Sequence, residues 1–448
     1  MKIKPKDGNK TFCMAPWSHT YVSPQGERRL CCASREKSSW IKQYIDIEND
    51  EKNKEFVSTK LDDHWNSEYM KNIRKDLMAG KEIEQCQVCN HKLLNLNTYR
   101  GYFNHQLFPD KIDEAFDKTR EDGHTDMNPI SYDYRISNLC NFKCRMCGDQ
   151  LSSSWESERR QMKNWTPEGD PWMTPENRTK LKNFTREVLE KELWQAVHEE
   201  RIEEIYWVGG EPLMFQIHWD IMEHLVKTGQ SKNVVVRYNT NLSRVEWKGV
   251  KLYDLLKHFK HVNISASIDG TGKIVEYVRD GIKWDRWLDN FKQGLFLKDL
   301  YGDAGIVLDV TITSPGLFAM KDLFDLALEL DVISYIKKTF EFDPAIVMSP
   351  SMIPRRILEP LVNDIVSYMK PKVTDKTQIY IDALEDVRDI KTFDEKYPDW
   401  LEGLERGKTN LKRVDNFRKC QYDIDKIFKE NNTELYDWWK TIPYETYI

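Results

Sequence analysis

The sequence predicts an α/β protein with a largely parallel sheet, a cysteine-rich segment before the sheet and a helical region after it. Three observations predict this fold class. Six short apolar or alternating runs recur between residues 130 and 347, stretches with helical periodicity separate them, and 448 residues are enough for two or three domains. Strands that alternate with helices form right-handed βαβ units. The runs should therefore pair in parallel, in a sheet that is open or curled into a partial or complete barrel.

The six predicted strands are short. They cover residues 132–136, 202–208, 234–238, 262–268, 306–312 and 337–347. Apolar residues at helical spacing fill the intervals, for example Ile217, Ile221 and Leu225 between the second and third strands. Prolines between residues 161 and 180 interrupt the first crossover and predict an inserted loop there.

Changes in composition divide the chain into three predicted domains. Gly, Asn and Pro cluster at residues 121–129, where the apolar periodicity stops, and this indicates a boundary. Charged helix formers dominate after Pro350. We therefore expect a cysteine-bearing domain at residues 1–125, the domain with the parallel sheet at 126–349 and a mostly helical region at 350–448.

The charge balance bears on the class of partner. The 67 basic and 73 acidic side chains give a net charge of −6, and both signs are mixed along the chain. Such a chain does not attract nucleic acid or an anionic membrane as a whole. Nowhere do about 18 uncharged apolar residues run together. No apolar stretch follows the charged N-terminus, so we expect a cytoplasmic protein that does not enter a membrane.

The nine cysteines fall into tight groups, which in a reducing compartment indicate metal or redox chemistry more often than disulfides. The most informative group is Cys140, Cys144 and Cys147, which supplies three thiolates within eight residues directly after the first predicted strand. An iron-sulfur cubane normally takes four cysteines, so three would leave one iron open to an exogenous ligand. The alternatives are a zinc knuckle, which needs four ligands, and buried free thiols.

Polar groups follow the next strands at the carboxyl edge of the sheet, where α/β folds bind ligands. Gly209 and Gly210 would let the backbone approach a ligand closely, and Glu211 could accept a hydrogen bond from an ammonium group. The alternative is an ordinary turn. Small polar residues that end the third and fourth strands could bond a ribose or a carboxylate, or cap the next helix. These residues are Thr240, Asn241 and Ser267.

A second set of cysteines lies in the N-terminal region. Its members are Cys13, Cys31, Cys86 and Cys89. Four thiolates imply a closed site, and zinc ribbons are also built from two separated pairs of thiolates. The residue types alone therefore leave zinc and an iron-sulfur cluster open.

The three-cysteine loop resembles the signature of the radical S-adenosylmethionine (SAM) superfamily, and Gly209-Gly210-Glu211-Pro212 resembles that family's motif for the SAM amino group. The resemblance implies a partial (β/α)6 barrel and a [4Fe-4S] cluster whose open iron binds SAM, with the three cysteines of the loop as ligands. An electron from such a cluster cleaves SAM to methionine and a 5'-deoxyadenosyl radical, which abstracts hydrogen from the substrate. The resemblance also implies SAM contacts from the polar residues that end the third and fourth strands.

The second set is similar to the twitch domain, a shortened SPASM domain that carries an auxiliary cluster. Twelve residues separate Cys13 from Gly26, four more precede Cys31, and Cys86 and Cys89 form a later pair. This resemblance implies an auxiliary [4Fe-4S] cluster, with Cys31 rather than the adjacent Cys32 as a ligand; zinc stays the alternative. In familiar members this segment follows the barrel, whereas here it precedes it.

Charged residues near the strand ends are candidates for catalytic groups that orient a substrate. Arg145 lies inside the three-cysteine loop, and Glu341 and Asp343 share one face of the sixth strand if its residues alternate. The alternative for each is a salt-bridged position at the rim.

The resemblance implies a radical SAM enzyme that uses two [4Fe-4S] clusters and SAM, with an electron donor such as a flavodoxin or ferredoxin. Two substrate classes are open: a small molecule such as a sugar or nucleotide, which would be oxidised or epimerised, and a peptide side chain. An alternative from a different class is a zinc-bound structural or nucleic-acid-binding protein. That alternative predicts a colourless protein without iron, and the net negative charge weighs against nucleic acid.

Overall fold

The computed structural model describes residues 9–34, 43–48, 50–91, 99–338 and 345–445. The chain forms two compact units, each assembled from several segments. The first unit contains Met1–Cys140, Asp149–Tyr238 and Asp254–His261, and the second contains Asn141–Gly148, Asn239–Tyr253 and Val262–Ile448. The three domains predicted from composition divide the chain differently, and their limits stay a prediction.

The first unit is built on a sheet with the strand order β2-β1-β5-β6-β7. The pairs β1·β5, β5·β6 and β6·β7 are parallel, and the short β2 is antiparallel to β1. The strands are β1 (His19–Val22), β2 (Arg28–Arg29), β5 (Ser131–Tyr134), β6 (Glu204–Trp207) and β7 (Val235–Thr240). The N-terminal segment that carries the second cysteine set thus adds strands to the edge of the predicted parallel sheet.

Strict alternation gives this sheet one apolar and one polar face. Ile205, Val236 and Tyr238 on the apolar face are almost completely buried. Helices α10 (Glu190–His198) and α11 (Gln216–Thr228) cover this face: Tyr134 donates to Glu192 of α10 over 2.8 Å, and the Tyr238 hydroxyl lies 2.8 Å from His218 of α11. The polar face carries the charged residues described below.

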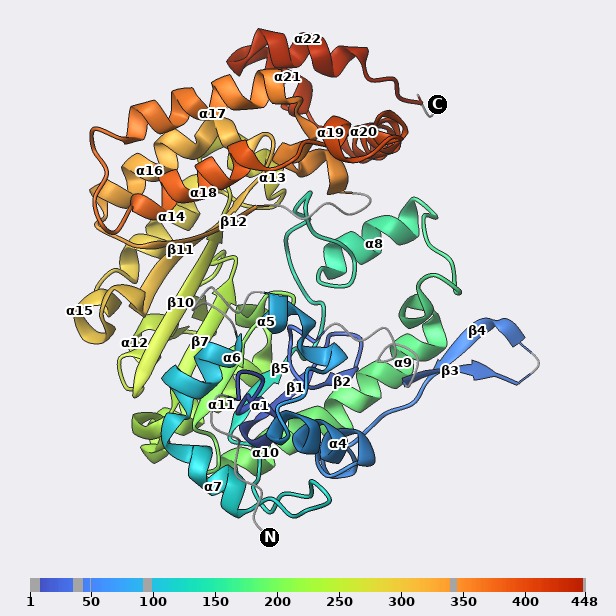
Figure 1. Cartoon of the computed structure of the whole chain (residues 1–448), viewed down its shortest axis with the longest axis vertical. Coiled ribbons are helices and arrows are strands. Elements are labelled where there is room, and N and C mark those ends of the chain that lie inside the picture. Colours follow the sequence, from blue (N-terminus) through green and yellow to red (C-terminus); the bar gives the residue numbers. More distant parts are fainter. Residues whose placement is uncertain (1–8, 35–42, 49, 92–98, 339–344, 446–448) are drawn as a thin grey trace. The chain divides into compact units, whose positions relative to one another are not determined.

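A separate apolar core holds the N-terminal part of the first unit together. Its members include Phe12, Trp17, Met70, Leu77 and Phe116, all buried. The surrounding helices are short, and Figure 1 shows the β3–β4 hairpin extending as an arm beside α9. The elements are α1 (Ala15–Ser18), β3 (Tyr44–Ile47), β4 (Asp50–Phe56), α3 (Leu61–Trp65), α4 (Glu68–Met78), α5 (Gln87–His91), α6 (Tyr99–Gly101), α7 (Ile112–Asp117), α8 (Ser153–Gln161) and α9 (Pro175–Phe184).

The second unit contains three parallel strands in the order β12-β11-β10, namely β10 (His261–Ile268), β11 (Ile306–Ile312) and β12 (Ser334–Lys338). Five of the six predicted strands lie where the sequence places them, to within two residues at most ends. The sixth begins three residues before its predicted start, because Asp331, with a φ of 50°, ends the preceding turn and lets Ser334 pair with Leu308. The predicted residues from 339 to 344 lie outside the described part of the chain.

Helices make up the rest of the second unit, as predicted for residues 350–448. Figure 1 shows the C-terminal helices gathered together in orange and red. The helices are α13 (Gly272–Val278), α14 (Trp284–Gln293), α15 (Leu297–Tyr301), α16 (Met320–Glu329), α17 (Arg355–Met369), α18 (Gln378–Asp389), α19 (Phe393–Lys396), α20 (Trp400–Phe417), α21 (Ile424–Asn431) and α22 (Thr433–Thr441). The short α12 (Leu252–Leu256) contains residues of both units. A small antiparallel pair, β8 (Glu246–Trp247) and β9 (Val250–Lys251), precedes α12.

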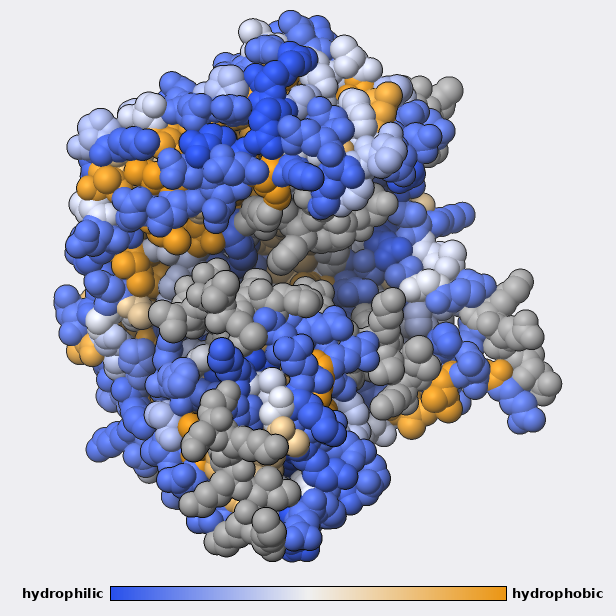
Figure 2. All heavy atoms as spheres, viewed as in Figure 1, coloured by the Kyte–Doolittle hydropathy of each residue, from blue (hydrophilic) through white to orange (hydrophobic). Residues whose placement is uncertain are grey.

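Hydrophilic side chains cover most of the face shown in Figure 2, and hydrophobic ones appear in smaller groups among them. No helix in the described residues is both long enough and apolar enough to cross a bilayer.

Candidate functional site

The three-cysteine loop begins directly after the chain leaves β5. Cys140 is half-buried and is held by the first turn of α8: its amide donates to Ser153 Oγ over 3.2 Å, and Ser154 Oγ donates to its carbonyl over 2.8 Å. Cys144 is buried and Cys147 is half-buried. None of the three forms a disulfide, so each thiol keeps its sulfur for a metal.

The part of the loop that belongs to the second unit, residues 141–148, is supported by the turn after α13. The amides of Lys143 and Arg145 donate to the carbonyls of Asp280 and Val278 over 2.7 and 2.8 Å. Gly281 closes this turn with a φ of 112°, and a Cβ there would lie 2.8 Å from the Phe142 ring. The backbone of the loop is therefore fixed by main-chain bonds.

The guanidinium of Arg279 exerts an electrostatic effect on the buried thiol of Cys144. Burial raises the pKa of Cys144 to about 12, and the positive charge of Arg279 opposes the rise. Arg279 is itself held by Asp269, with Nε 2.5 Å from Oδ2. A fixed positive charge favours thiolate over thiol, which is the form that binds a metal.

The glycine pair lies against the start of the same loop. Gly209 and Gly210 have φ values of 85° and 55°, and the Glu211 amide donates to the Leu139 carbonyl over 2.7 Å. A Cβ on Gly210 would lie 2.4 Å from that carbonyl oxygen. The sequence predicted close approach of these glycines to a ligand, whereas here they approach the chain immediately before Cys140. The Glu211 side chain is buried and accepts from the Leu213 amide over 3.1 Å.

The second cysteine set lies around one cavity in the first unit. The four sulfur-bearing residues Cys13, Cys31, Cys86 and Cys89 line it together with apolar side chains such as Leu30. Burial raises the pKa of Cys13 to about 12, and the negative charges of Cys86 and Cys89 add to the rise, so these thiols lie close enough to interact. Cys32 does not line this cavity.

Two protein families match the chain. The model of the radical SAM superfamily matches residues 134–294, and that of SPASM, an iron-sulfur cluster-binding domain, matches residues 13–90. This chain is a radical SAM enzyme with an auxiliary-cluster domain. The predicted family is thereby confirmed, with the SPASM segment ahead of the barrel segment in the sequence.

Solved structures similar to this radical SAM enzyme include two of Streptococcus suis SuiB. The crystal structure of SuiB shares 14% identity over 64% of this chain and 57% of that chain, with a TM-score of 0.35. SuiB bound to S-adenosylmethionine shares 14% over 71% and 66%, with a TM-score of 0.36. TYW1 with a lysine-pyruvate adduct bound shares 11% over 55% and 74%, with a TM-score of 0.29. The enzyme spans less than two thirds of either SuiB chain, and no curated protein matches its sequence.

Membership of this superfamily means that the enzyme uses a [4Fe-4S] cluster and SAM, and its SPASM domain means auxiliary iron-sulfur chemistry. The cysteines present fit such groups in number and in chemistry: one loop offers three cysteines that form no disulfide, and one cavity is lined by four more. Among the described residues, no three His, Cys, Asp or Glu side chains form a group that could hold a single metal ion.

The side chain of Arg145, in the three-cysteine loop, contacts residues that are far away in the sequence. Its Nε donates to Asp415 of α20 over 3.0 Å, its Nη2 lies 2.9 Å from Cys420 Sγ, and its guanidinium stacks 3.7 Å from the Tyr277 ring centroid. Tyr277 also donates to Asp415 over 3.0 Å. The Arg145 side chain, predicted as catalytic, thus lies in a buried ion-pair network. Sequence reasoning missed Asp415, because nothing local to α20 points to the loop.

The predicted SAM contacts lie in three different settings within the second unit. Thr240 Oγ1 accepts from the Leu242 amide over 3.0 Å, which is a local turn bond. Asn241 Nδ2 donates to Asn141 Oδ1 over 3.1 Å, so this side chain lies against the cluster loop. Ser267 Oγ lies 3.5 Å from Asp309 Oδ2.

Asp309 of β11 is the centre of a polar group in the second unit, whose other members are Asn239 of β7, Ser267 of β10 and Lys337 of β12. It is buried, accepts from Asn239 Nδ2 over 2.9 Å, and forms an ion pair with Lys337 Nζ at 3.0 Å. The predicted catalytic residues Glu341 and Asp343 lie outside the described residues. Asp309 of β11 and Lys337 of β12 thus form another charged pair in this unit, besides that of Asp269 and Arg279.

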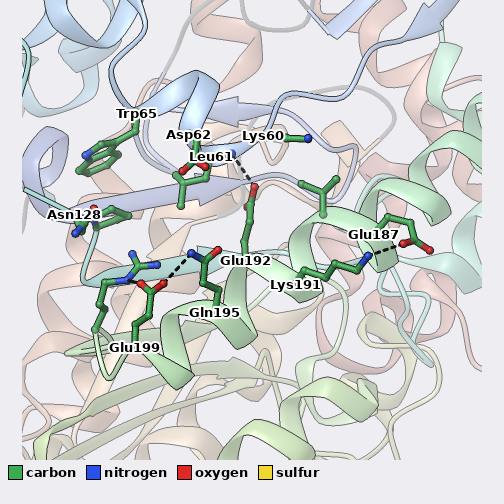
Figure 3. A pocket seen from close by; sticks show the side chains of 13 residues that line it. Lys60, Leu61, Asp62, Trp65, Asn128, Glu187, Lys191, Glu192, Gln195 and Glu199 are labelled. Carbon is green, nitrogen blue, oxygen red and sulfur yellow. Dashed lines mark hydrogen bonds and ion pairs between the residues drawn. The ribbon is translucent and has the colours of Figure 1, made fainter.

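Figure 3 shows a groove on the first unit between α10 and the segment that leads into α3. The Leu61 amide donates to Glu192 over 2.7 Å, and Lys191 pairs with Glu187 at 2.8 Å. No cysteine and no residue of the glycine motif lines this groove. It is not part of the site described above.

Proposed function

We propose that the enzyme cleaves SAM at a cluster held by Cys140, Cys144 and Cys147 and uses the resulting radical to abstract hydrogen from a small molecule, such as a sugar or nucleotide, for oxidation or epimerisation. The observation that carries the proposal is the bond between the Glu211 amide and the Leu139 carbonyl, 2.7 Å long. This hydrogen bond joins the glycine motif to the residue before Cys140, the first cysteine of the three-cysteine loop. The two motifs lie about 60 residues apart in the sequence, and the chemistry of SAM cleavage needs both.

When bound, the cluster supplies the electron that splits SAM into methionine and a 5'-deoxyadenosyl radical, which takes a hydrogen atom from the substrate. The chain's own residues do the rest. The three cysteines would hold the cluster, and Arg279 stabilises the thiolate form of Cys144. The glycine turn supports the chain next to Cys140 through the bond from the Glu211 amide to the Leu139 carbonyl.

We assign the SAM contacts to the residues predicted for them. Two observations support this assignment. The glycine motif, Gly209 to Glu211, lies against Leu139 at the start of the three-cysteine loop. The Asn241 side chain donates a hydrogen bond to Asn141 within that loop. Thr240 and Ser267 follow from their positions at strand ends. Among the predicted catalytic residues, Arg145 acts on the loop through its network with Asp415, and Glu341 and Asp343 are proposed from the sequence alone.

We assign the auxiliary cluster to Cys13, Cys31, Cys86 and Cys89. Their common cavity supports the choice of Cys31 over Cys32. These four thiolates would hold an auxiliary cluster, which would supply a one-electron carrier to the enzyme.

The enzyme needs a one-electron donor and a substrate. We propose a flavodoxin or ferredoxin as the donor. We also propose the cytoplasm as the compartment, because none of the nine cysteines forms a disulfide. The small-molecule substrate is supported by the density of polar side chains on one face of the sheet.

The test is anaerobic purification followed by incubation with SAM and dithionite. A brown protein with about eight irons that forms 5'-deoxyadenosine supports the proposal. The Cys144→Ala variant should keep about four irons and form none of this product. A fully loaded wild-type enzyme that yields no 5'-deoxyadenosine would contradict the assignment.

A further inference from the structure

We propose that the polar face of the sheet in the first unit holds a binding site for an oxyanion, either a phosphate ester or a carboxylate, with Arg237 as its main contact and Arg135 as its second. The site deepens the proposed function, since the ligand bound there would be the substrate of the radical reaction. It defines the substrate by the anionic group that it carries.

Arg237 is immobilised in the free protein. Its Nε donates to Glu204 Oε1 over 2.8 Å, and its guanidinium lies between two rings, 4.3 Å from the centroid of Tyr102 and 4.1 Å from that of Tyr206. Glu204 is fully buried and also accepts from Ser131, which fixes it in turn. A guanidinium fixed in this way loses little further freedom when it binds a ligand.

The binding edge of this guanidinium is open. Nη1 and Nη2 of Arg237 make no hydrogen bond to any residue in the described ranges, and the side chain is 14% exposed. With Nε occupied by Glu204, these two nitrogens remain available for a ligand. A guanidinium edge matches two oxygens on one atom, as in a phosphate or carboxylate, and such charge-assisted bonds are among the strongest in proteins.

Arg135 places a second positive charge near the first. Its Nε and Nη2 donate to Asp133 over 3.1 and 3.3 Å, and its Nη1 makes no hydrogen bond within the described part of the chain. Burial raises the pKa of Tyr206, and both Arg237 and Arg135 oppose that rise, so the two guanidiniums act on the same phenol.

The Arg135 side chain also joins this site to the glycine motif. A Cβ on Gly209 would lie 2.6 Å from Arg135 Cβ, so the arginine stem passes directly over the glycine. The second arginine of the proposed site is therefore packed against Gly209 within the same unit. A cation is not favoured, because the carboxylates of Asp133 and Glu204 are buried and already paired.

The experiment is a thermal-shift titration of the reconstituted full-length enzyme with inorganic phosphate and, separately, with acetate, at constant ionic strength set by sodium chloride. We expect a saturable rise in the melting temperature of the wild type. Arg237→Lys keeps the charge beside Glu204 but lacks the planar fork, and should weaken the apparent affinity by about tenfold or more. Arg135→Lys should weaken it less. Arg186→Gln, at an exposed arginine paired with Glu187, should bind like the wild type.

A response to phosphate alone identifies a phosphate ester, a response to acetate alone identifies a carboxylate, and responses to both support the shared oxyanion chemistry. No saturable response in the wild type, or equal affinities in the wild type and both lysine variants, would overturn the site. Formation of 5'-deoxyadenosine by the same wild-type preparation separates the two proposals. If the product forms while the arginine variants bind anions normally, only the anion site fails; if a loaded enzyme forms none, the proposed function fails.

Discussion

Gly210 is the residue at which the geometry of the site depends most directly on the absence of a side chain. Its φ of 55° and the 2.4 Å that a Cβ would leave to the Leu139 carbonyl mean that any other residue must displace the chain next to Cys140. Gly210→Ala should therefore lower the free energy of unfolding by about 2–4 kcal/mol, from backbone strain and from overpacking. It should also reduce the loading of the loop cluster, measured as iron content and by the low-temperature spectrum of the reduced protein.

Gly229→Ala is the matched control for this substitution. Gly229 has a φ of 80°, but a Cβ there would meet no atom within 4 Å. It should lose only about 1–2 kcal/mol, the cost of the left-handed backbone, and load both clusters normally. Equal cluster loading in the two variants would show that the contact with Leu139 does not shape the loop.

Two adjacent cysteines should behave differently. Cys31→Ala should reduce the iron content from about eight to about four, because Cys31 faces the other thiols in the auxiliary cavity. Cys32→Ala should keep all the iron, since Cys32 is turned toward Tyr99 and the charged residues of the polar face. Metal analysis of anaerobically reconstituted protein measures both. Loss of iron in Cys32→Ala with retention in Cys31→Ala would reverse the assignment.

At this scale the sequence indicated which residues carry the chemistry but not what each of them touches. Spacing alone picked out the cysteines and the glycine pair. It could not show that Gly210 avoids a carbonyl of its own chain, since that contact depends on where two strands end in space. The sequence also could not identify Arg237 as a binding residue. The role proposed for it depends on its ion pair with the buried Glu204, which lies on the neighbouring strand.

At the scale of elements, α20 holds the cluster loop in place. Asp415 forms an ion pair with the buried Arg145, and Arg418 donates to the Lys143 carbonyl over 2.9 Å. Asp415→Ala would leave the Arg145 charge buried and unpaired, so it should cost about 3–5 kcal/mol of stability. Chemical denaturation measures this loss, and the content of the loop cluster should fall with it.

Two further variants separate a positioning role from a general loss of stability. The paired substitution Arg145→Met with Asp415→Leu removes both charges together and should recover most of the lost stability. Glu434→Ala breaks an ion pair with Arg356 that is more than half exposed, and should cost at most about 1 kcal/mol. If Asp415→Ala is no more destabilising than Glu434→Ala, the network does not hold the loop.

The elements themselves were largely predictable, and their partners were not. Buried strands with alternating or apolar runs, such as β10 and β11, lie at the predicted residues because burial determines their composition. The predicted start of the sixth strand was three residues too late in the sequence. Its alternating run is short, and its residues Tyr335 and Lys337 are exposed, so burial does not determine their composition. The position of β1 beside β5 was not predictable, because parallel pairing depends on contacts over a hundred residues apart.

At the scale of the whole molecule, buried histidines tie stability to pH. His19 and His218 are buried in the first unit, and the pKa of each is lowered to about 3. Burial is the cause for both, and the positive charges of Arg237 and Arg135 contribute to the shift of His19. Each ring is neutral in the folded state, whereas in the unfolded chain it takes up a proton below about pH 6.5. The unfolded state therefore binds more protons between about pH 6.5 and 3, and stability should fall as the pH is lowered through that window.

Each histidine should contribute a slope of about 1.4 kcal/mol per pH unit in this range. Chemical denaturation of the full-length protein at pH 7, 6 and 5 measures the slope. His218→Gln, at the position that faces the Tyr238 hydroxyl across 2.8 Å, should be less stable than the wild type at pH 7 but lose less stability on acidification. The double variant with His19→Gln should lose less again. Parallel stability curves for the wild type and both variants would mean that the acid sensitivity comes from other groups, and that neither ring is held neutral by its surroundings.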